Sequence, residues 1–156
     1  MLNDGYRLLA ELSAVDGERR ITRLGQRMAR LPVDPRLARV IVEAARLGCL
    51  PECLVITAFL SIQDPRERPL DAQAAADQAH ARFRDPKSDF AGLLRLWAWL
   101  REQRKAVSGN QFRKLCRGEF LNWQRVLEWF DLYQQLRDQA REDRLPLSGK
   151  HGSYEQ

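Results

Sequence analysis

The sequence has few of the residues on which metal sites, disulfide frameworks or membrane spans depend. Its only cysteines are Cys49, Cys53 and Cys116, with no CxxC pair, and its only histidines are His80 and His151. A structural zinc site is therefore not expected, and the cysteines are interpreted as reduced thiols that act as small apolar fillers. The longest apolar run, residues 53–60, is far below the roughly 20 residues that a membrane-spanning helix requires. Since no secretory pattern opens the chain either, a cytoplasmic protein with no membrane partner is expected.

Motifs for nucleotide hydrolysis are also missing. The one Gly-Lys pair, Gly149-Lys150, lacks the upstream glycine of a phosphate-binding loop. Residues 77–80, Asp-Gln-Ala-His, lack the glutamate of an Asp-Glu-x-His box. No serine or cysteine has an identifiable histidine partner for nucleophilic catalysis. We therefore expect no catalytic residue, no metal and no cofactor in this chain.

Lysine is scarce, at four of the 26 basic residues, and the basic residues are unevenly placed. Residues 86–125 hold nine Lys or Arg against three Asp or Glu, and residues 1–50 hold nine against six. Residues 51–85 and 126–156 each hold four against six, so two basic blocks are separated by an acidic one. Arginine-rich clusters of this kind suit contact with a polyanion, because the guanidinium group binds phosphates with paired hydrogen bonds. A solvated basic surface would give the same pattern.

Apolar residues recur at helical spacing along almost the whole chain, which predicts an all-α fold. One short strand is expected at Glu18–Ile21, after a first helix that runs to Asp16-Gly17. Thr22, Asp34, Ser88 and Ser108 are expected to cap helices at their first turns, and Gly48 to end one. The predicted core stripes are Leu37, Val40, Ile41, Ala44 and Leu47 in one helix and Phe90, Leu93, Leu94, Trp97 and Leu100 in another. A helix that is apolar on all sides over residues 54–60 is expected to end at Asp64-Pro65.

Four segments resemble, in order and spacing, the region after the second RecA-like domain of DEAH-box helicases. They are GYRLLAELSAVD (5–16) with ITRLGQRMA (21–29), LPVDPRLAR (31–39) with EAARLGC (43–49), LSIQDPRERP (60–69), and KSDF (87–90) followed by FRKLC (112–116) and FLNW (120–123). The third segment together with Ser88-Asp89-Phe90 is most similar to the bacterial HrpA-type members. The family often has Gly where Ser13 stands and Pro where Arg23 stands.

The resemblance implies the end of a winged-helix domain over residues 1–32, a ratchet-like bundle of about seven helices over residues 33–144, and a linker or tail over residues 145–156. A winged-helix unit without its opening elements is expected in a piece of a longer chain. In the family this region forms one wall of a channel for single-stranded RNA, and ATP and Mg²⁺ belong to the RecA-like domains. The implied partners are therefore single-stranded RNA and the other domains of a helicase. A helical protein-interaction scaffold that binds no nucleic acid is the alternative.

Three groups of residues are candidates for RNA contact. Arg104, Lys105, Arg113, Lys114 and Arg117 cluster around a predicted turn between two helices, where cations and exposed N–H groups meet phosphates. Arg95 and Trp99 are four residues apart and suit stacking on a base, although such a tryptophan often fills a second helical interface with an arginine across it. Ser61, Gln63 and Arg66 form a polar corner at a helix end, which could also be ordinary helix termination.

Overall fold

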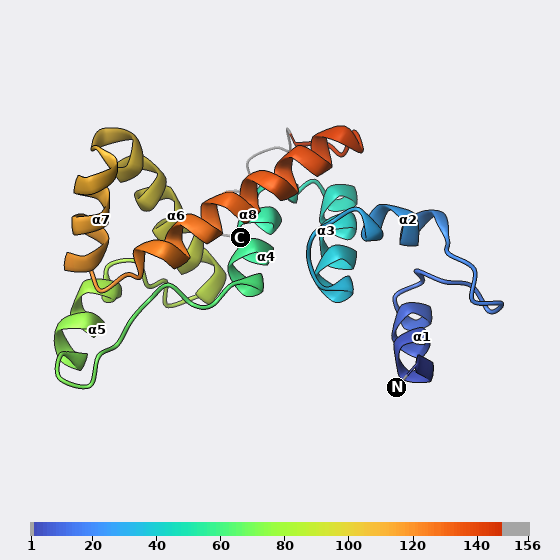
Figure 1. The fold of residues 1–156 in the computed structure, drawn as a ribbon, viewed down its shortest axis with the longest axis horizontal. Coiled ribbons are helices and arrows are strands. Elements are labelled where there is room, and N and C mark those ends of the chain that lie inside the picture. The colour runs from blue at the N-terminus through green and yellow to red at the C-terminus, as the bar shows by residue number, and fades with distance from the viewer. Residues whose placement is uncertain (1, 148–156) are drawn as a thin grey trace. The chain divides into compact units, whose positions relative to one another are not determined.

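The structure is all-helical, as the apolar periodicity predicts. A computed structural model describes residues 2–147, and it shows eight helices in them (Figure 1). They are α1 (Leu2–Glu11), α2 (Arg23–Ala29), α3 (Pro35–Leu47), α4 (Leu50–Ser61), α5 (Gln73–Ala81), α6 (Asp89–Ala106), α7 (Gly109–Gly118) and α8 (Trp123–Glu142). Six of these, α3–α8, lie in the segment for which the sequence indicates about seven. Most of the expected tail, residues 148–156, lies outside the described residues.

The chain forms two compact units. Of the described residues, the first unit holds 2–61 and 132–147, and the second holds Ile62–Asp131. Helix α8 contributes residues to both units.

Capping residues set the helix boundaries of the first unit. The Thr22 hydroxyl accepts a hydrogen bond from the Gly25 amide at 3.0 Å and starts α2. The Asp34 carboxylate accepts from the Arg36 amide at 2.8 Å and starts α3, and Gly48 ends α3 in the left-handed conformation at φ 78°. Each cap satisfies a backbone group that the helix leaves open, and each confirms its prediction from the sequence.

The core of the first unit lies where α3 packs against α4. Ile41 of α3 and Leu50, Leu54 and Ala58 of α4 are completely buried. Burial of one Leu or Ile side chain stabilises a fold by about 1.5–3 kcal/mol. Helix α4 is therefore central, as its all-round apolar pattern predicts.

Two predictions for the winged-helix part are wrong. Helix α1 ends at Glu11, well before Asp16, because Ser13 adopts a left-handed φ of 61° that no α-helix accommodates. No strand forms at Glu18–Ile21: Ile21 makes only one isolated antiparallel bridge, to Val15. The Asp16 carboxylate accepts hydrogen bonds from the amides of Glu18 and Arg20, both at 2.9 Å, and so closes a tight turn in place of the strand.

An aromatic cluster joins α6, α7 and the first half of α8 in the second unit. The ring of Trp97 in α6 lies 4.9 Å from that of Trp129 and 5.3 Å from that of Phe130, both in α8. Phe112 of α7 stacks on Phe130 at 6.1 Å, and Phe112 and Trp129 are fully buried. Large aromatic side chains bury much area, so they fix the geometry of the three helices.

The turn before α8 holds two other segments of the second unit. The Glu67 amide donates to the Phe120 carbonyl at 2.8 Å, and the Asn122 amide donates to the Pro65 carbonyl at 2.7 Å. The Nε2 of His80, in α5, lies 3.1 Å from the carbonyl oxygens of both Glu119 and Phe120. Because a carbonyl oxygen only accepts, this nitrogen carries the proton.

Three further expectations are corrected. On α3, Val40 and Leu47 are 50% and 66% exposed, since the buried face is centred on Ile41. On α6, Phe90 is 52% exposed, and the buried stripe includes Leu96 instead. Helix α4 ends at Ser61, before the expected break at Asp64-Pro65.

Candidate nucleic-acid interface

The turn between α6 and α7 is fixed by hydrogen bonds that the sequence encodes. The Ser108 hydroxyl accepts from the Gln111 amide at 3.3 Å, and the Gln111 side chain accepts from the Ser108 amide at 3.2 Å. This reciprocal pair is a capping box, which satisfies two otherwise open amides at the start of α7. The predicted cap at Ser108 is thus confirmed, and the orientation of the first turn of α7 is set locally.

Helix α7 has one buried and one basic face. Phe112 and Cys116, four residues apart, are completely buried. Arg113, Lys114 and Arg117 are exposed. Since residues three and four apart share a helix face, Lys114 and Arg117, and likewise Arg113 and Arg117, are neighbours on the surface. Burial of the apolar face therefore directs these three cations to solvent.

The C-terminal end of α6 adds Arg104 and Lys105, so five of the candidate residues lie on the two helices that meet at this turn. We call Arg104, Lys105, Arg113, Lys114 and Arg117 the basic turn cluster. None of the five forms an ion pair within residues 2–147. Residues 101–118 hold six Lys or Arg and one acidic residue, Glu102. The positive charge of the cluster is therefore not neutralised inside the fold.

Two arginines of the basic turn cluster lie over aromatic rings. The guanidinium carbon of Arg113 is 5.1 Å from the centre of the Trp123 ring, and that of Arg104 is 5.9 Å from the centre of the Phe112 ring. A cation over a ring at such a distance gains about 0.5–1 kcal/mol at an exposed site. The contact orders the side chain and leaves guanidinium N–H groups without a carboxylate partner.

The polar corner of Ser61, Gln63 and Arg66 is divided between the two units. The Ser61 hydroxyl donates to the Thr57 carbonyl at 2.8 Å, a bond within α4. Ser61 closes the first unit, whereas Gln63 and Arg66 belong to the second. Gln63 is exposed, and Arg66 donates to Asp64 from Nε at 3.0 Å and from a terminal nitrogen at 2.8 Å.

The Asp64–Arg66 pair shifts both pKa values. Burial raises the pKa of Asp64, but hydrogen bonds from the side chain and backbone of Arg66 outweigh burial, so the pKa is lowered overall. The side-chain hydrogen bond to Asp64 raises the pKa of Arg66. Both groups are therefore charged at neutral pH.

Arg95 and Trp99 are each engaged with other parts of the second unit. Arg95 pairs with Asp85 at 3.0 Å and donates to the Arg84 carbonyl at 3.3 Å. The ring of Trp99 lies 5.3 Å from that of Phe83, and the guanidinium of Arg82 lies 4.5 Å above it. Trp99 therefore packs against the segment that follows α5, with the Arg82 guanidinium across its ring.

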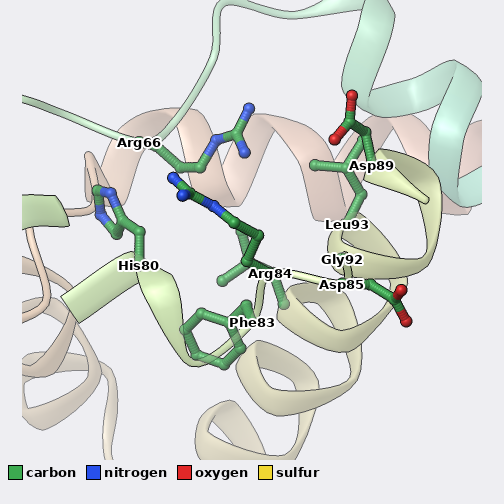
Figure 2. A pocket seen from close by; sticks show the side chains of 9 residues that line it. Arg66, His80, Phe83, Arg84, Asp85, Asp89, Gly92 and Leu93 are labelled. Carbon is green, nitrogen blue, oxygen red and sulfur yellow. The ribbon is translucent and has the colours of Figure 1, made fainter. Parts of the chain in front are cut away.

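The second unit contains a cavity of about 550 Å³ that the sequence does not predict. Of its lining residues, Arg66 alone is among the predicted site residues. Figure 2 shows the side chains that line it. They are Arg66, His80, Phe83, Arg84, Asp85, Asp89, Gly92, Leu93 and Leu96. These residues come from three separate stretches of sequence, and Arg84 lies in the net-acidic block 51–85, where no basic site is expected. No local signal in the sequence marks the cavity.

The cysteines differ in their surroundings. Burial raises the pKa of Cys53 to about 12 and that of Cys116 to about 11. Cys49 is exposed, so the interpretation as an apolar filler is wrong for this residue.

Across residues 2–147, no three potential metal ligands gather in one place. No helix in the same stretch has the length and apolar character needed to cross a bilayer.

Two family models match the chain, one after the other. The model described as "Helicase associated domain (HA2), winged-helix" matches residues 6–33. The model described as "Helicase associated domain (HA2), ratchet-like" matches residues 34–93. Together they account for more than half of the chain.

Relatives with similar sequences are named as RNA helicases. The chain is 48% identical over 158 residues to "ATP-dependent RNA helicase HrpA" of Escherichia coli (strain K12). This alignment covers 98% of the chain and 12% of the relative. It is 48% identical over 162 residues to the "ATP-dependent RNA helicase HrpA homolog" of Haemophilus influenzae, with coverages of 99% and 12%. It is 40% identical over 89 residues to "Pre-mRNA-splicing factor ATP-dependent RNA helicase prp22" of Schizosaccharomyces pombe, with coverages of 57% and 8%. The chain thus spans about one eighth of the length of the bacterial relatives.

Proposed function

Because this chain belongs to the helicase-associated (HA2) family, and joins its winged-helix and ratchet-like parts, we propose that it is the accessory RNA-contacting region of an HrpA-like, DEAH-box RNA helicase. In this role it performs no chemistry. ATP and Mg²⁺ bind to RecA-like domains elsewhere in the protein, and this region helps to form the channel for single-stranded RNA while those domains step along it.

The observation that carries the proposal is the basic turn cluster. Its five cations are exposed and free of ion pairs within the described residues, so they are available to a polyanion. Cations that are already paired with carboxylates would have to break those pairs before they could bind phosphate. The start of α7 adds the positive end of the helix dipole, which favours phosphate.

The strength of this contact depends on salt, because phosphate neutralisation releases counterions from the nucleic acid. Each neutralised phosphate of a single strand adds about 0.7 to the slope of log affinity against log salt concentration. Removal of two phosphate contacts therefore lowers the size of this slope by about 1.4. When the salt concentration rises fourfold, a variant without the two contacts should lose about seven times less affinity than the unchanged chain.

Charge reversal in α7 tests the proposal. Fluorescence anisotropy of a labelled single-stranded RNA would be measured with the 156-residue chain and with the double variant Arg113→Glu/Lys114→Glu at several salt concentrations. We expect weak, salt-sensitive binding by the unchanged chain, and a lower affinity with a smaller salt slope for the variant.

The control is Arg23→Glu/Arg27→Glu, which makes the same change in net charge at two exposed residues of α2. A loss in the α7 variant that exceeds the loss in this control supports a local contact. Equal effects of the two variants would mean that only net charge matters. An affinity that neither variant changes would favour a protein-interaction scaffold and contradict the proposed RNA contact.

A further inference from the structure

The cavity of the second unit combines cationic and apolar walls. Figure 2 shows Arg66 and Arg84 on the same side of the space, with Asp89 across from Arg66 and the ring of Phe83 below. Arg66 precedes α5, Arg84 follows it, and Asp89 stands in the first turn of α6. Three stretches of chain therefore supply its polar groups.

Arg84 is the cation of this cavity that is available to an anion. Its side chain is exposed and forms no ion pair or hydrogen bond within residues 2–147. Arg66 is bound to Asp64, and Asp85 is bound to Arg95 at 3.0 Å. The positive end of the cavity is thus centred on Arg84, with Arg66 beside it.

The carboxylate of Asp89 would repel an anion that enters this cavity. Its charge is one of the causes that raise the pKa of Arg66, which places it within electrostatic reach of that guanidinium. Asp77, which interacts electrostatically with Arg84, is bound to Arg68 by hydrogen bonds of 2.8 and 2.9 Å. Asp89 is therefore the carboxylate whose removal should most strengthen anion binding.

The apolar wall is closely packed against the rest of the second unit. Leu93 and Leu96 are almost fully buried, and Phe83 is held by ring contact with Trp99 at 5.3 Å. A Cβ added at Gly92 would lie 3.0 Å from the Phe83 carbonyl oxygen, so α6 approaches this backbone as closely as glycine allows. The wall offers a flat ligand an apolar surface that does not need to rearrange.

The size of the cavity selects among anions. Its volume of about 550 Å³ falls within the range of about 300–1,000 Å³ that is typical of small-molecule sites. A lone phosphate would leave most of the apolar wall in contact with water. A nucleotide would place its phosphate at the arginines and its base against the apolar wall.

We propose that the cavity lined by Arg66, Phe83, Arg84 and Leu93 binds one nucleotide of a single-stranded RNA, with the phosphate held by Arg84 and Arg66. The proposal rests on the RNA-contacting function above and adds to it a second contact point, lined by residues that do not belong to α7. It assigns to Arg84 the role of phosphate anchor and to Phe83 and Leu93 the role of a surface for the base.

Mononucleotides test this site separately from the α7 surface. Binding of AMP and adenosine to the whole chain would be measured by saturation-transfer difference NMR, and inorganic phosphate and a single-stranded oligoadenylate would each be added as competitors of AMP. The variants are Arg84→Gln, Asp89→Asn and, as a matched control, Arg141→Gln, which changes an exposed arginine of the last turn of α8. Far-UV circular dichroism checks that each variant is folded.

We expect AMP to bind better than adenosine or phosphate, and the oligoadenylate to displace it. Arg84→Gln should weaken AMP binding about tenfold or more, the usual effect of losing a hydrogen bond to a charged group. Asp89→Asn should tighten binding about threefold, because a nearby negative charge is removed. Arg141→Gln should have no effect.

AMP binding that is unchanged in Arg84→Gln would overturn the inference, as would AMP binding that the oligoadenylate does not displace. Phosphate binding as tight as AMP binding would overturn the role of the apolar wall. The double variant Arg113→Glu/Lys114→Glu separates this inference from the proposed function. If it weakens RNA binding while Arg84→Gln does not, the cavity proposal fails and the proposed function stands.

Discussion

Replacement of Ser13 by glycine should stabilise the first unit. Ser13 has a φ of 61°, a conformation that costs a residue with a Cβ about 1–2 kcal/mol. Glycine avoids this cost but loses about 0.5–1 kcal/mol more chain entropy on folding. The net gain in the free energy of unfolding is therefore about 0.5–1 kcal/mol.

Glycine at position 13 would keep the surrounding backbone hydrogen bonds. The Ser13 amide donates to the Ala10 carbonyl at 3.0 Å, and the Ser13 carbonyl accepts from the Thr22 hydroxyl at 2.6 Å. Both are backbone groups of Ser13, so glycine keeps them. The Ser13 side chain is exposed and makes no hydrogen bond within the described residues. The substitution removes only the Cβ and a solvated hydroxyl.

Urea unfolding, followed by far-UV circular dichroism, measures the effect. For a chain of this length, the gain corresponds to a rise in Tm of about 1–4 °C. Ser13→Ala is the matched control, because it removes the hydroxyl and keeps the Cβ; its stability should stay near that of the original chain. A Ser13→Gly variant less stable than Ser13→Ala would refute the strain argument.

Three further changes test other parts of the fold. Gly25→Ala should destabilise the first unit by about 1–3 kcal/mol, measured by urea unfolding, because the new Cβ would overlap the Ala14 carbonyl and lie 2.9 Å from Ile21 Cγ1. Leu100→Ala, at a fully buried side chain, should cost about 2–5 kcal/mol in the same assay, and an effect below that range would contradict its place in the core. Asp64→Asn should reduce stability at neutral pH, because the folded-state pKa of Asp64 is lowered; unfolding titrations at several pH values should show this difference shrinking as the pH falls below the ordinary value of 3.8.

The sequence predicts the capped helix boundaries better than it predicts which faces are buried. Thr22, Asp34, Ser108 and Gly48 act through hydrogen bonds or backbone angles within a few residues, so their roles can be inferred from local sequence. Phe90 illustrates the opposite case. Its spacing places it on an apolar face, but periodicity cannot tell whether another element covers that face, and the side chain is 52% exposed.

The candidate site follows the same division. The basic turn cluster could be found from the sequence because its cations flank one turn between two helices. The nucleotide-sized cavity could not, because Arg66, Arg84 and Leu93 are brought together only by tertiary structure. The hydrogen bonds that hold residues 65–67 against the turn before α8 join positions more than 50 residues apart, as between Glu67 and Asn122. No motif or spacing reports a contact of that range.

The capping box at Ser108 and Gln111 has a thermodynamic consequence for ligand binding. Ordering one residue of a flexible backbone costs about 1–2 kcal/mol at room temperature. Helix α7 has already met this cost on folding, since its first turn is capped and Phe112 is fully buried. In the proposed contact, an RNA strand would order Arg and Lys side chains of this helix but not its backbone, so a larger share of each ionic contact would remain as affinity.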